Sequence, residues 1–180
     1  MLVAKDKIKT NVGEYFLYMF QIEDLIRACN FNKEIIESNL VAQYQTDEST
    51  KNEIKDWYFG LTDLMIEEKL EKKGQLGFIS NKINEVNDFH QYLLQKADYI
   101  EYQNRFNNII PLINDLKSKQ KQELNDINIL LNAIYGIYLL KLQKKEVSDD
   151  TLLSAGKFSK LLAELSKKFS KYESGELKIE

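Results

Sequence analysis

The chain has 180 residues, 43% of them hydrophobic, so it is long enough to bury one substantial core and short for two domains. It contains 7 glycines and 1 proline, too few for the many turns of a sheet protein, while residues that favour helices dominate. A formal net charge of −3 excludes a general attraction to nucleic acid. The single cysteine, Cys29, excludes an internal disulfide, and the N-terminus has no secretory leader, so we expect a cytoplasmic protein.

Apolar residues recur at helical spacing over most of the chain and mark out seven segments in order. The first covers about 11–28, and a short segment follows over 33–44. The stretch TDEST then caps a third helix, with Thr50 and Glu53 in the spacing of a capping box. We expect this third helix to end at Gly74, because glycine readily adopts the left-handed conformation that ends many helices.

The fourth segment begins near Phe78, and the fifth covers 99–116. Pro111 lies inside the fifth and removes a backbone donor, so we predict a kink there. A helix that restarts at Pro111 is the alternative. The sixth segment covers 122–144. Ser148 is a good N-cap for the seventh, whose apolar positions alternate by four and three residues.

These segments predict an all-α fold, a single compact bundle of six to seven helices. The bundle domain would cover residues 1–172, and a polar tail would follow over 173–180. The most apolar run is INILLNAIYGIYLLKL, residues 127–142. It is shorter than the roughly 20 residues that cross a membrane, so we interpret it as a core helix and expect no membrane span.

Four motifs stand out along the chain: EYFLYMFQIEDLIRA, IKDWYFGL, DFHQYLL and AIYGIYLLKLQKKEVS. In order and spacing they resemble a small all-helical bacterial family, catalogued only as a domain of unknown function and found chiefly in Bacteroidetes-type bacteria. The resemblance covers nearly the whole chain and implies a cytoplasmic helical bundle, with no assigned activity. The positions that match the recurring pattern are Tyr15, Gln21, Glu23, Asp24, Arg27, Trp57, His90, Tyr135 and Gly136.

Three charged residues, Glu23, Asp24 and Arg27, are set into the otherwise apolar first segment. Arg27 can pair with Glu23 four residues earlier and with Asp24 three residues earlier. A helix that is apolar nearly all round is a central, buried one, so these charges must be satisfied internally. We therefore predict a buried ion-pair network that fixes how the first helix docks. The polar floor of a pocket is the alternative.

The sixth segment carries Asn128, Asn132 and Gly136 four residues apart, on one narrow stripe. Gly136 would let another backbone approach closely. Buried asparagine amides need partners, and Gln21 is a candidate. We interpret this stripe as structural.

His90, the only histidine, lies on the apolar stripe of the fourth segment, and Trp57 adjoins a similar stripe on the third. We expect both in the core, with the wall of a ligand pocket as the alternative. No second histidine and no Glu-x-x-His occur, so neither a zinc site nor a di-iron site of the usual helical kind is expected. A Gly-rich phosphate loop and a nucleophile motif are absent from the sequence as well.

One formal match concerns carboxylates. Glu67, Glu68 and Glu71 in EEKLE, followed by Glu85 and Asp88 in EVND, have the shape of the metal motif of all-α nucleotide pyrophosphohydrolases. Those enzymes need facing carboxylates to bind Mg²⁺. On the predicted helix faces only Glu68 points inward, so the carboxylates do not converge and we disfavour this activity.

Several lysines of the seventh segment lie opposite its apolar seam. A basic amphipathic helix is typical of a membrane surface or a partner site, but a solvated face is the commoner explanation. The lysines are Lys157, Lys160, Lys167, Lys168 and Lys171.

The sequence therefore favours a non-enzymatic protein that works through binding, as a homo-oligomer or an adaptor, with no cofactor, no metal and no identified partner. The alternative is a small-ligand-binding or enzymatic bundle. A ligand site needs a concave pocket on which polar groups converge, whereas an adaptor needs an exposed apolar patch or a symmetric interface. The pocket of the alternative would be lined by Gln21, Glu23, Asp24, Arg27, Trp57, His90 and Tyr135.

Overall fold

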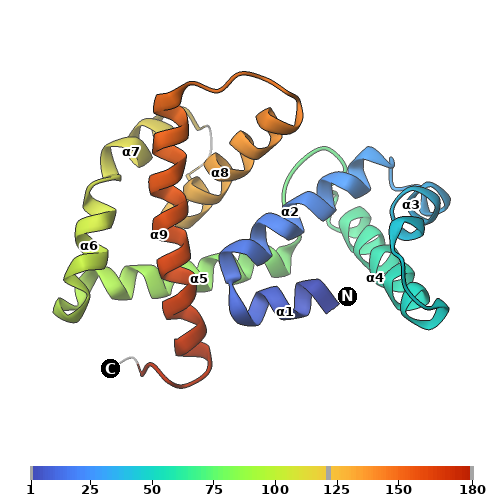
Figure 1. Ribbon diagram of the computed structural model, residues 1–180, viewed down its shortest axis with the longest axis horizontal. Helices are drawn as coiled ribbons and strands as arrows, with labels where there is room; N and C mark the ends of the chain where they lie inside the picture. Colours follow the sequence, from blue (N-terminus) through green and yellow to red (C-terminus); the bar gives the residue numbers. More distant parts are fainter. Residues whose placement is uncertain (1, 121–122, 179–180) are drawn as a thin grey trace.

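The computed structural model describes residues 2–120 and 123–178. In these ranges the chain forms nine α-helices and two short 3-10 helices, and no strand (Figure 1). The all-α prediction is confirmed, but the described residues form nine α-helices instead of six to seven. The α-helices are α1 (Leu2–Thr10), α2 (Val12–Ala28), α3 (Lys33–Asn39), α4 (Glu48–Glu67), α5 (Gly77–Gln95), α6 (Ile100–Asn107), α7 (Ile110–Ser118), α8 (Asp126–Leu142) and α9 (Asp149–Glu173), and the 3-10 helices are η1 (Val41–Gln43) and η2 (Ala97–Tyr99).

Two features of the sequence account for the larger number of helices. The first is α1, which precedes the first predicted segment and packs against α2 and α9, with Ala4 buried and Ile8 partly buried against the core. It is only nine residues long, so its apolar residues carry little periodic signal. The second is Pro111, which lies in the first turn of α7, so the chain restarts a helix there and the predicted kink is wrong. The predicted sixth helix began at residue 122, outside the described residues.

The ends of α4 also differ from expectation. Asp47 is the N-cap, and its side chain accepts a hydrogen bond from the backbone N–H of Thr50. At the other end Lys69 takes the left-handed conformation, with φ 58°, and Leu70 N–H donates to Met65 O. Gly74, with φ 102°, lies in the following loop and does not end the helix. The predicted N-cap at Ser148 of α9 is confirmed.

Helix α2 occupies the centre of the molecule, where it packs against α1, α4, α5, α8 and α9 (Figure 1). Its side chains Phe16, Met19, Ile22 and Ile26 are almost completely buried. Helices α3 and α4 lie at one side of the molecule, beyond the C-terminal end of α2. Because α2 touches helices from both ends of the chain, its polar residues decide how those helices are held together.

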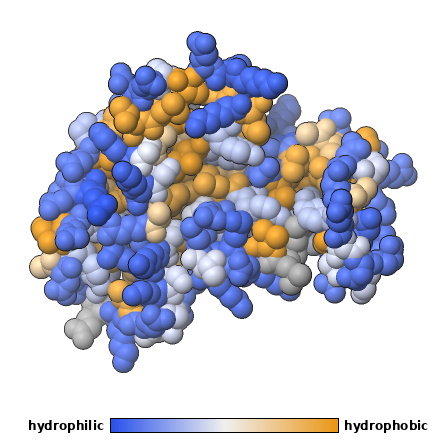
Figure 2. Space-filling model, viewed as in Figure 1, coloured by the Kyte–Doolittle hydropathy of each residue, from blue (hydrophilic) through white to orange (hydrophobic). Residues whose placement is uncertain are grey.

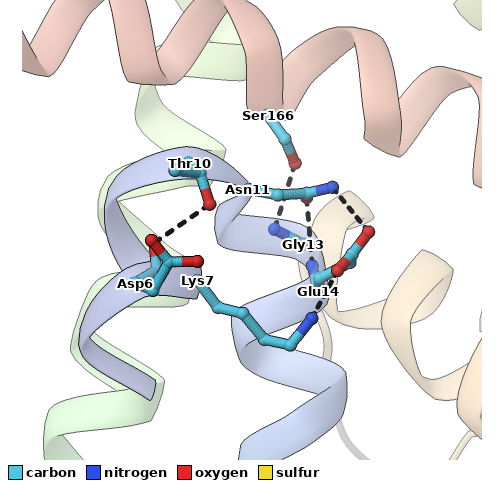
Figure 3. A network of polar contacts seen from close by, with 7 residues as sticks. All are labelled: Asp6, Lys7, Thr10, Asn11, Gly13, Glu14 and Ser166. Carbon is cyan, nitrogen blue, oxygen red and sulfur yellow. Dashed lines mark hydrogen bonds and ion pairs between the residues drawn. The ribbon is translucent and has the colours of Figure 1, made fainter. Parts of the chain in front are cut away.

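The junction of α1, α2 and α9 depends on one glycine (Figure 3). Gly13 N–H donates to Ser166 Oγ of α9 over 3.0 Å, and Asn11 caps α2 by accepting from Glu14 N–H. Lys7 of α1 is ion-paired with Glu14 at 2.5 Å. A Cβ atom at position 13 would lie 2.8 Å from Leu162 Cγ and 2.9 Å from Ser166 Oγ, so α9 can come this close only to a glycine.

We predict that Gly13→Ala lowers the free energy of unfolding by about 1–3 kcal/mol, because the added methyl group must push α9 away. Gly60 is the matched control, since it lies in the interior of α4 and a Cβ atom there would have no other atom within 4 Å. Gly60→Ala should raise stability by about 0.5–1 kcal/mol. Urea unfolding of both variants measures the difference, and equal stabilities would contradict the close approach.

Candidate functional site

The guanidinium of Arg27 is held by three oxygens. Its Nε donates to Leu70 O over 3.0 Å, one terminal nitrogen donates to Gly74 O, and the other pairs with Asp24 Oδ1 at 2.7 Å. The Arg27 side chain is only 15% exposed. Its donors are therefore taken up mainly by backbone carbonyls of the loop between α4 and α5.

Asp24 connects this arrangement to α8. Its second oxygen, Oδ2, accepts a hydrogen bond from the hydroxyl of Tyr135 over 2.8 Å. Burial and this bond to Asp24 raise the pKa of the Tyr135 hydroxyl, which stays protonated. The ring of Tyr135 also packs edge-on against Phe20 of α2. We call the group formed by Asp24, Arg27, Tyr135 and the carbonyls of Leu70 and Gly74 the Arg27 clasp.

Glu23 lies beside the clasp but does not pair with Arg27, so the predicted ion pair between the two is wrong. Its side chain is fully buried, and Oε1 accepts from the backbone N–H of Leu76 over 2.8 Å. Oε2 has no hydrogen-bond partner among the described residues. Burial raises the pKa of Glu23 to about 7, against which the Leu76 N–H and the charge of Arg27 act only in part.

Glu68 is likewise occupied by the loop that follows α4. Its carboxylate accepts a hydrogen bond from Gly77 N–H, at the start of α5, over 2.7 Å. Glu85 pairs with Lys82 on the exposed side of α5, and Asp88 is exposed as well. Within residues 2–120 and 123–178, no group of three or more His, Cys, Asp or Glu side chains is placed to hold a metal ion.

His90 forms a second polar cluster, on the opposite end of α5 from the clasp. Its side chain is fully buried, and Nδ1 lies 2.5 Å from the hydroxyl of Tyr102. Nε2 lies 3.7 Å from Asp126, which is paired with Lys117 at 2.6 Å. The His90 imidazole and the Lys117 ammonium lower the pKa of Asp126 to about 2. This cluster joins α5, α6, α7 and α8, and a fully enclosed imidazole cannot meet a substrate.

The remaining candidates lie apart. Trp57 is half-buried on α4, where its ring packs edge-on against Tyr58 at 5.1 Å between centroids. Gln21 lies one turn before Asp24 on α2, and with Tyr135 it lines a hollow of about 300 Å³ between α1, α2 and α8, which we call the Gln21 hollow. The structure thus gathers Glu23, Asp24, Arg27 and Tyr135, and leaves Trp57 and His90 elsewhere. The full lining of the Gln21 hollow is Lys7, Glu14, Leu17, Tyr18, Gln21, Ile134, Tyr135 and Tyr138.

A larger concave space, which the sequence patterns did not predict, lies between α7, α8 and α9. Its volume is about 630 Å³. Apolar side chains gather along α8 and the beginning of α9 around it (Figure 2). Asp115, Lys119 and Asp150 stand among the polar lining residues. We call this space the α8 hollow, and its apolar lining consists of Leu112, Leu116, Ala133, Gly136, Ile137, Leu140, Ala155 and Phe158.

The stripe of asparagine and glycine on α8 lines this space and does not pack against another helix. Asn132 is exposed and lines the α8 hollow together with Gly136. No atom lies within 4 Å of a Cβ position at Gly136, so no backbone approaches it closely. The structural interpretation of the stripe is therefore wrong at Asn132 and Gly136. The signal in the sequence that could have revealed the hollow is the pairing of polar and small residues on an otherwise apolar helix.

The family model described as a domain of unknown function, DUF4924, matches residues 1–176 of the chain. The chain belongs to this family. Membership confirms the resemblance over nearly the whole DUF4924 chain and assigns it no activity, while a bacterial origin stays a prediction. No curated protein and no solved structure matches it. Among the described residues of this DUF4924 protein, no helix has the length and apolar character needed to span a membrane.

We predict that Arg27→Ala lowers the free energy of unfolding by about 2–4 kcal/mol, because it leaves two loop carbonyls and the Asp24 carboxylate without their donor. Arg105→Ala is the control, since Arg105 is 55% exposed and pairs with Glu164 on the surface. That change should cost less than about 1 kcal/mol. Thermal and urea unfolding measure both, and an Arg27 variant that melts like the parent would show that the clasp is not structural.

We also predict that Glu23 makes stability depend on pH. Its pKa is about 7 in the folded protein against an ordinary value of 4.5, so between these values the folded state keeps a proton that the unfolded state has lost. The free energy of unfolding therefore falls as pH rises from 4.5 to 7, by roughly 3 kcal/mol from this group. Glu23→Gln stays neutral and should lack this contribution.

Urea unfolding of the parent and the Glu23→Gln variant across this pH range isolates the contribution of Glu23, because every other group titrates in both proteins. The variant should gain stability relative to the parent as pH rises. A constant difference between the two proteins would contradict the raised pKa.

Proposed function

We propose that this DUF4924 protein is a non-enzymatic binding protein, and that the α8 hollow receives the apolar face of a helix. One observation carries the proposal. The segment 133–142 of α8 belongs to the most apolar run of the chain, has Lys141 as its one charged residue, and contains no fully buried residue. A helix that is apolar nearly all round is normally buried, so this half of α8 lacks a covering partner.

The shape and chemistry of the α8 hollow support a helical occupant. Its walls come from three helices, as in grooves that take the apolar face of an amphipathic helix. Leu142 and Leu153, 60% and 66% exposed, lie on the helix ends where α8 leads into α9 and extend the apolar surface. A partner that continues past the hollow would cover these two side chains, which a small molecule confined to the hollow would leave in water.

The polar clusters of the core support a non-enzymatic role. Arg27 and Asp24 are engaged by loop carbonyls and by Tyr135, and His90 is enclosed. A catalytic acid or base must come within hydrogen-bonding reach of its substrate. We extend the proposal to a bacterial, cytoplasmic protein that works as a homo-oligomer or an adaptor. The compact bundle over residues 1–172 with a tail over 173–180 remains part of the same proposal.

A small-ligand site is the second candidate, and the Gln21 hollow favours it. This hollow adjoins the Arg27 clasp through Tyr135 and offers the Gln21 amide and two further tyrosines, Tyr18 and Tyr138. Its volume of about 300 Å³ is at the lower end of the usual range for ligand sites. It is therefore weaker support than the larger α8 hollow.

The apolar dye anilinonaphthalene sulfonate tests which hollow binds. We expect it to fluoresce on binding the parent at low protein concentration, because an accessible apolar hollow shields the dye from water. Ala155→Phe fills the α8 hollow and should reduce bound dye several-fold. Gly156→Phe is the matched control, one residue along α9 on an exposed position with no atom within 4 Å of its Cβ.

Equal loss of dye in both variants, or in neither, would contradict the proposal. Loss in Gln21→Ala with full binding in Ala155→Phe would support the second candidate instead. Thermal melts of each variant show whether the fold is intact.

A further inference from the structure

We infer that the occupant of the α8 hollow is the same half of α8 from a second copy of the chain. The inference rests on the proposed function, since it names the partner of the same site. It would make the protein a two-fold symmetric dimer in which each copy supplies both the groove and the helix that fills it.

The first argument is shape. The outer half of α8 stands between two hollows: Ala133 and Ile137 line the α8 hollow, whereas Ile134 and Tyr138 line the Gln21 hollow. This half of α8 is therefore a ridge with a furrow on each side. A ridge beside a furrow is complementary to its own copy turned about a two-fold axis, and helices pack in general by laying ridges into grooves.

The second argument is the open position at Gly136. A glycine in the middle of a helix costs about 0.5–1 kcal/mol relative to alanine. Nothing within the described part of the chain approaches Gly136, so no contact inside the monomer accounts for it. In the wall of the α8 hollow, the missing side chain gives a second α8 room to lie close to the first.

The third argument is charge. Lys141 lies one turn beyond Ile137 and Tyr138, on the top of the ridge, and Asp150 lines the α8 hollow from α9. Neither makes an ion pair with any described residue, whereas Asp115 and Lys119 at the same hollow pair with each other at 2.6 Å. The ridge thus carries one cation, and the groove presents one unpaired anion.

The directions of α8 and α9 place Lys141 and Asp150 at the same end of the α8 hollow. Helices α8 and α9 run in roughly opposite senses and diverge toward the arching loop that joins them, so the end of α8 and the start of α9 stand on opposite sides of the α8 hollow (Figure 1). A second α8 that runs parallel to the first therefore places its Lys141 beside Asp150. The two-fold axis repeats the pair, and the dimer contains it twice. An anionic membrane is a poorer occupant, because Asp150 would repel it.

Analytical ultracentrifugation from micromolar to millimolar concentrations tests the inference. The parent should change from monomer to dimer, and dye binding should fall over the same range, because the dye and the second copy compete for the hollow. Ala155→Phe should weaken self-association, while Gly156→Phe should leave it unchanged.

Charge reversal identifies the pair. Lys141→Glu and Asp150→Lys each turn two attractive contacts per dimer into two repulsive ones, so each should weaken self-association about tenfold. A mixture of the two variants should dimerise like the parent, because in the mixed dimer Glu meets Lys at one site and Lys meets Asp at the other. Recovery on mixing is not expected of a site for another protein.

The outcomes separate the two proposals. A parent that binds dye in the α8 hollow but stays monomeric at every concentration overturns the second copy and leaves the binding role standing, with another protein as the occupant. A parent that neither binds dye nor dimerises overturns both. Dimers that persist unchanged in Ala155→Phe, or charge variants that do not recover on mixing, overturn the second copy alone.

Discussion

The Arg27 guanidinium bonds to oxygens from two separate parts of the chain, and the packing around α2 depends on this arrangement. Leu70 O and Gly74 O come from the loop that follows α4, and Asp24 passes the connection on to Tyr135 of α8. A charged group with little exposure must have its hydrogen bonds made inside the protein, or its burial is costly. Meeting that requirement closes the loop between α4 and α5 over α2 and sets where α8 crosses it.

Glu23 is also buried, but only part of its hydrogen-bonding capacity is satisfied inside the protein. One oxygen accepts from Leu76 N–H, and the other is buried with no described partner. A carboxylate in that position is unfavourable, which is why burial raises its pKa to about 7. The protein thus places two ionisable groups side by side on α2 and treats them differently. The carbonyls around Arg27 accept the hydrogen bonds of its guanidinium, whereas Glu23 is buried with a single N–H donor, and its burial raises the pKa toward the neutral form.

Helix α8 is buried by its neighbours over only part of its length. Its N-terminal half is sealed in the core through Ile127, Leu130 and Leu131, and Tyr135 fixes its middle to the clasp. Beyond that point its apolar surface faces hollows on two sides. Holding α8 at Tyr135 thus anchors the inner half and leaves the outer half free of covering helices. The Arg27 clasp and the α8 hollow are therefore both related to the way α8 is attached at Tyr135.

Local sequence pattern predicted much of this protein: the all-α class, the central place of α2 and the burial of His90 follow from the spacing of apolar residues, and the cap at Ser148 follows from the type of that residue. Whether Pro111 kinks a helix or starts one could not be decided from a stripe that keeps its phase either way. Only the tertiary structure decided which groups the side chains of Arg27 and Glu23 bond to. Arg27 donates to the carbonyls of Leu70 and Gly74, and Glu23 accepts from the backbone N–H of Leu76. Backbone acceptors and donors have no side-chain signature, and these partners lie far along the chain. The tertiary structure alone also decided that the outer half of α8 is left uncovered. Hydrophobic periodicity shows which face of a helix avoids water, but it does not show which segment of the chain covers that face.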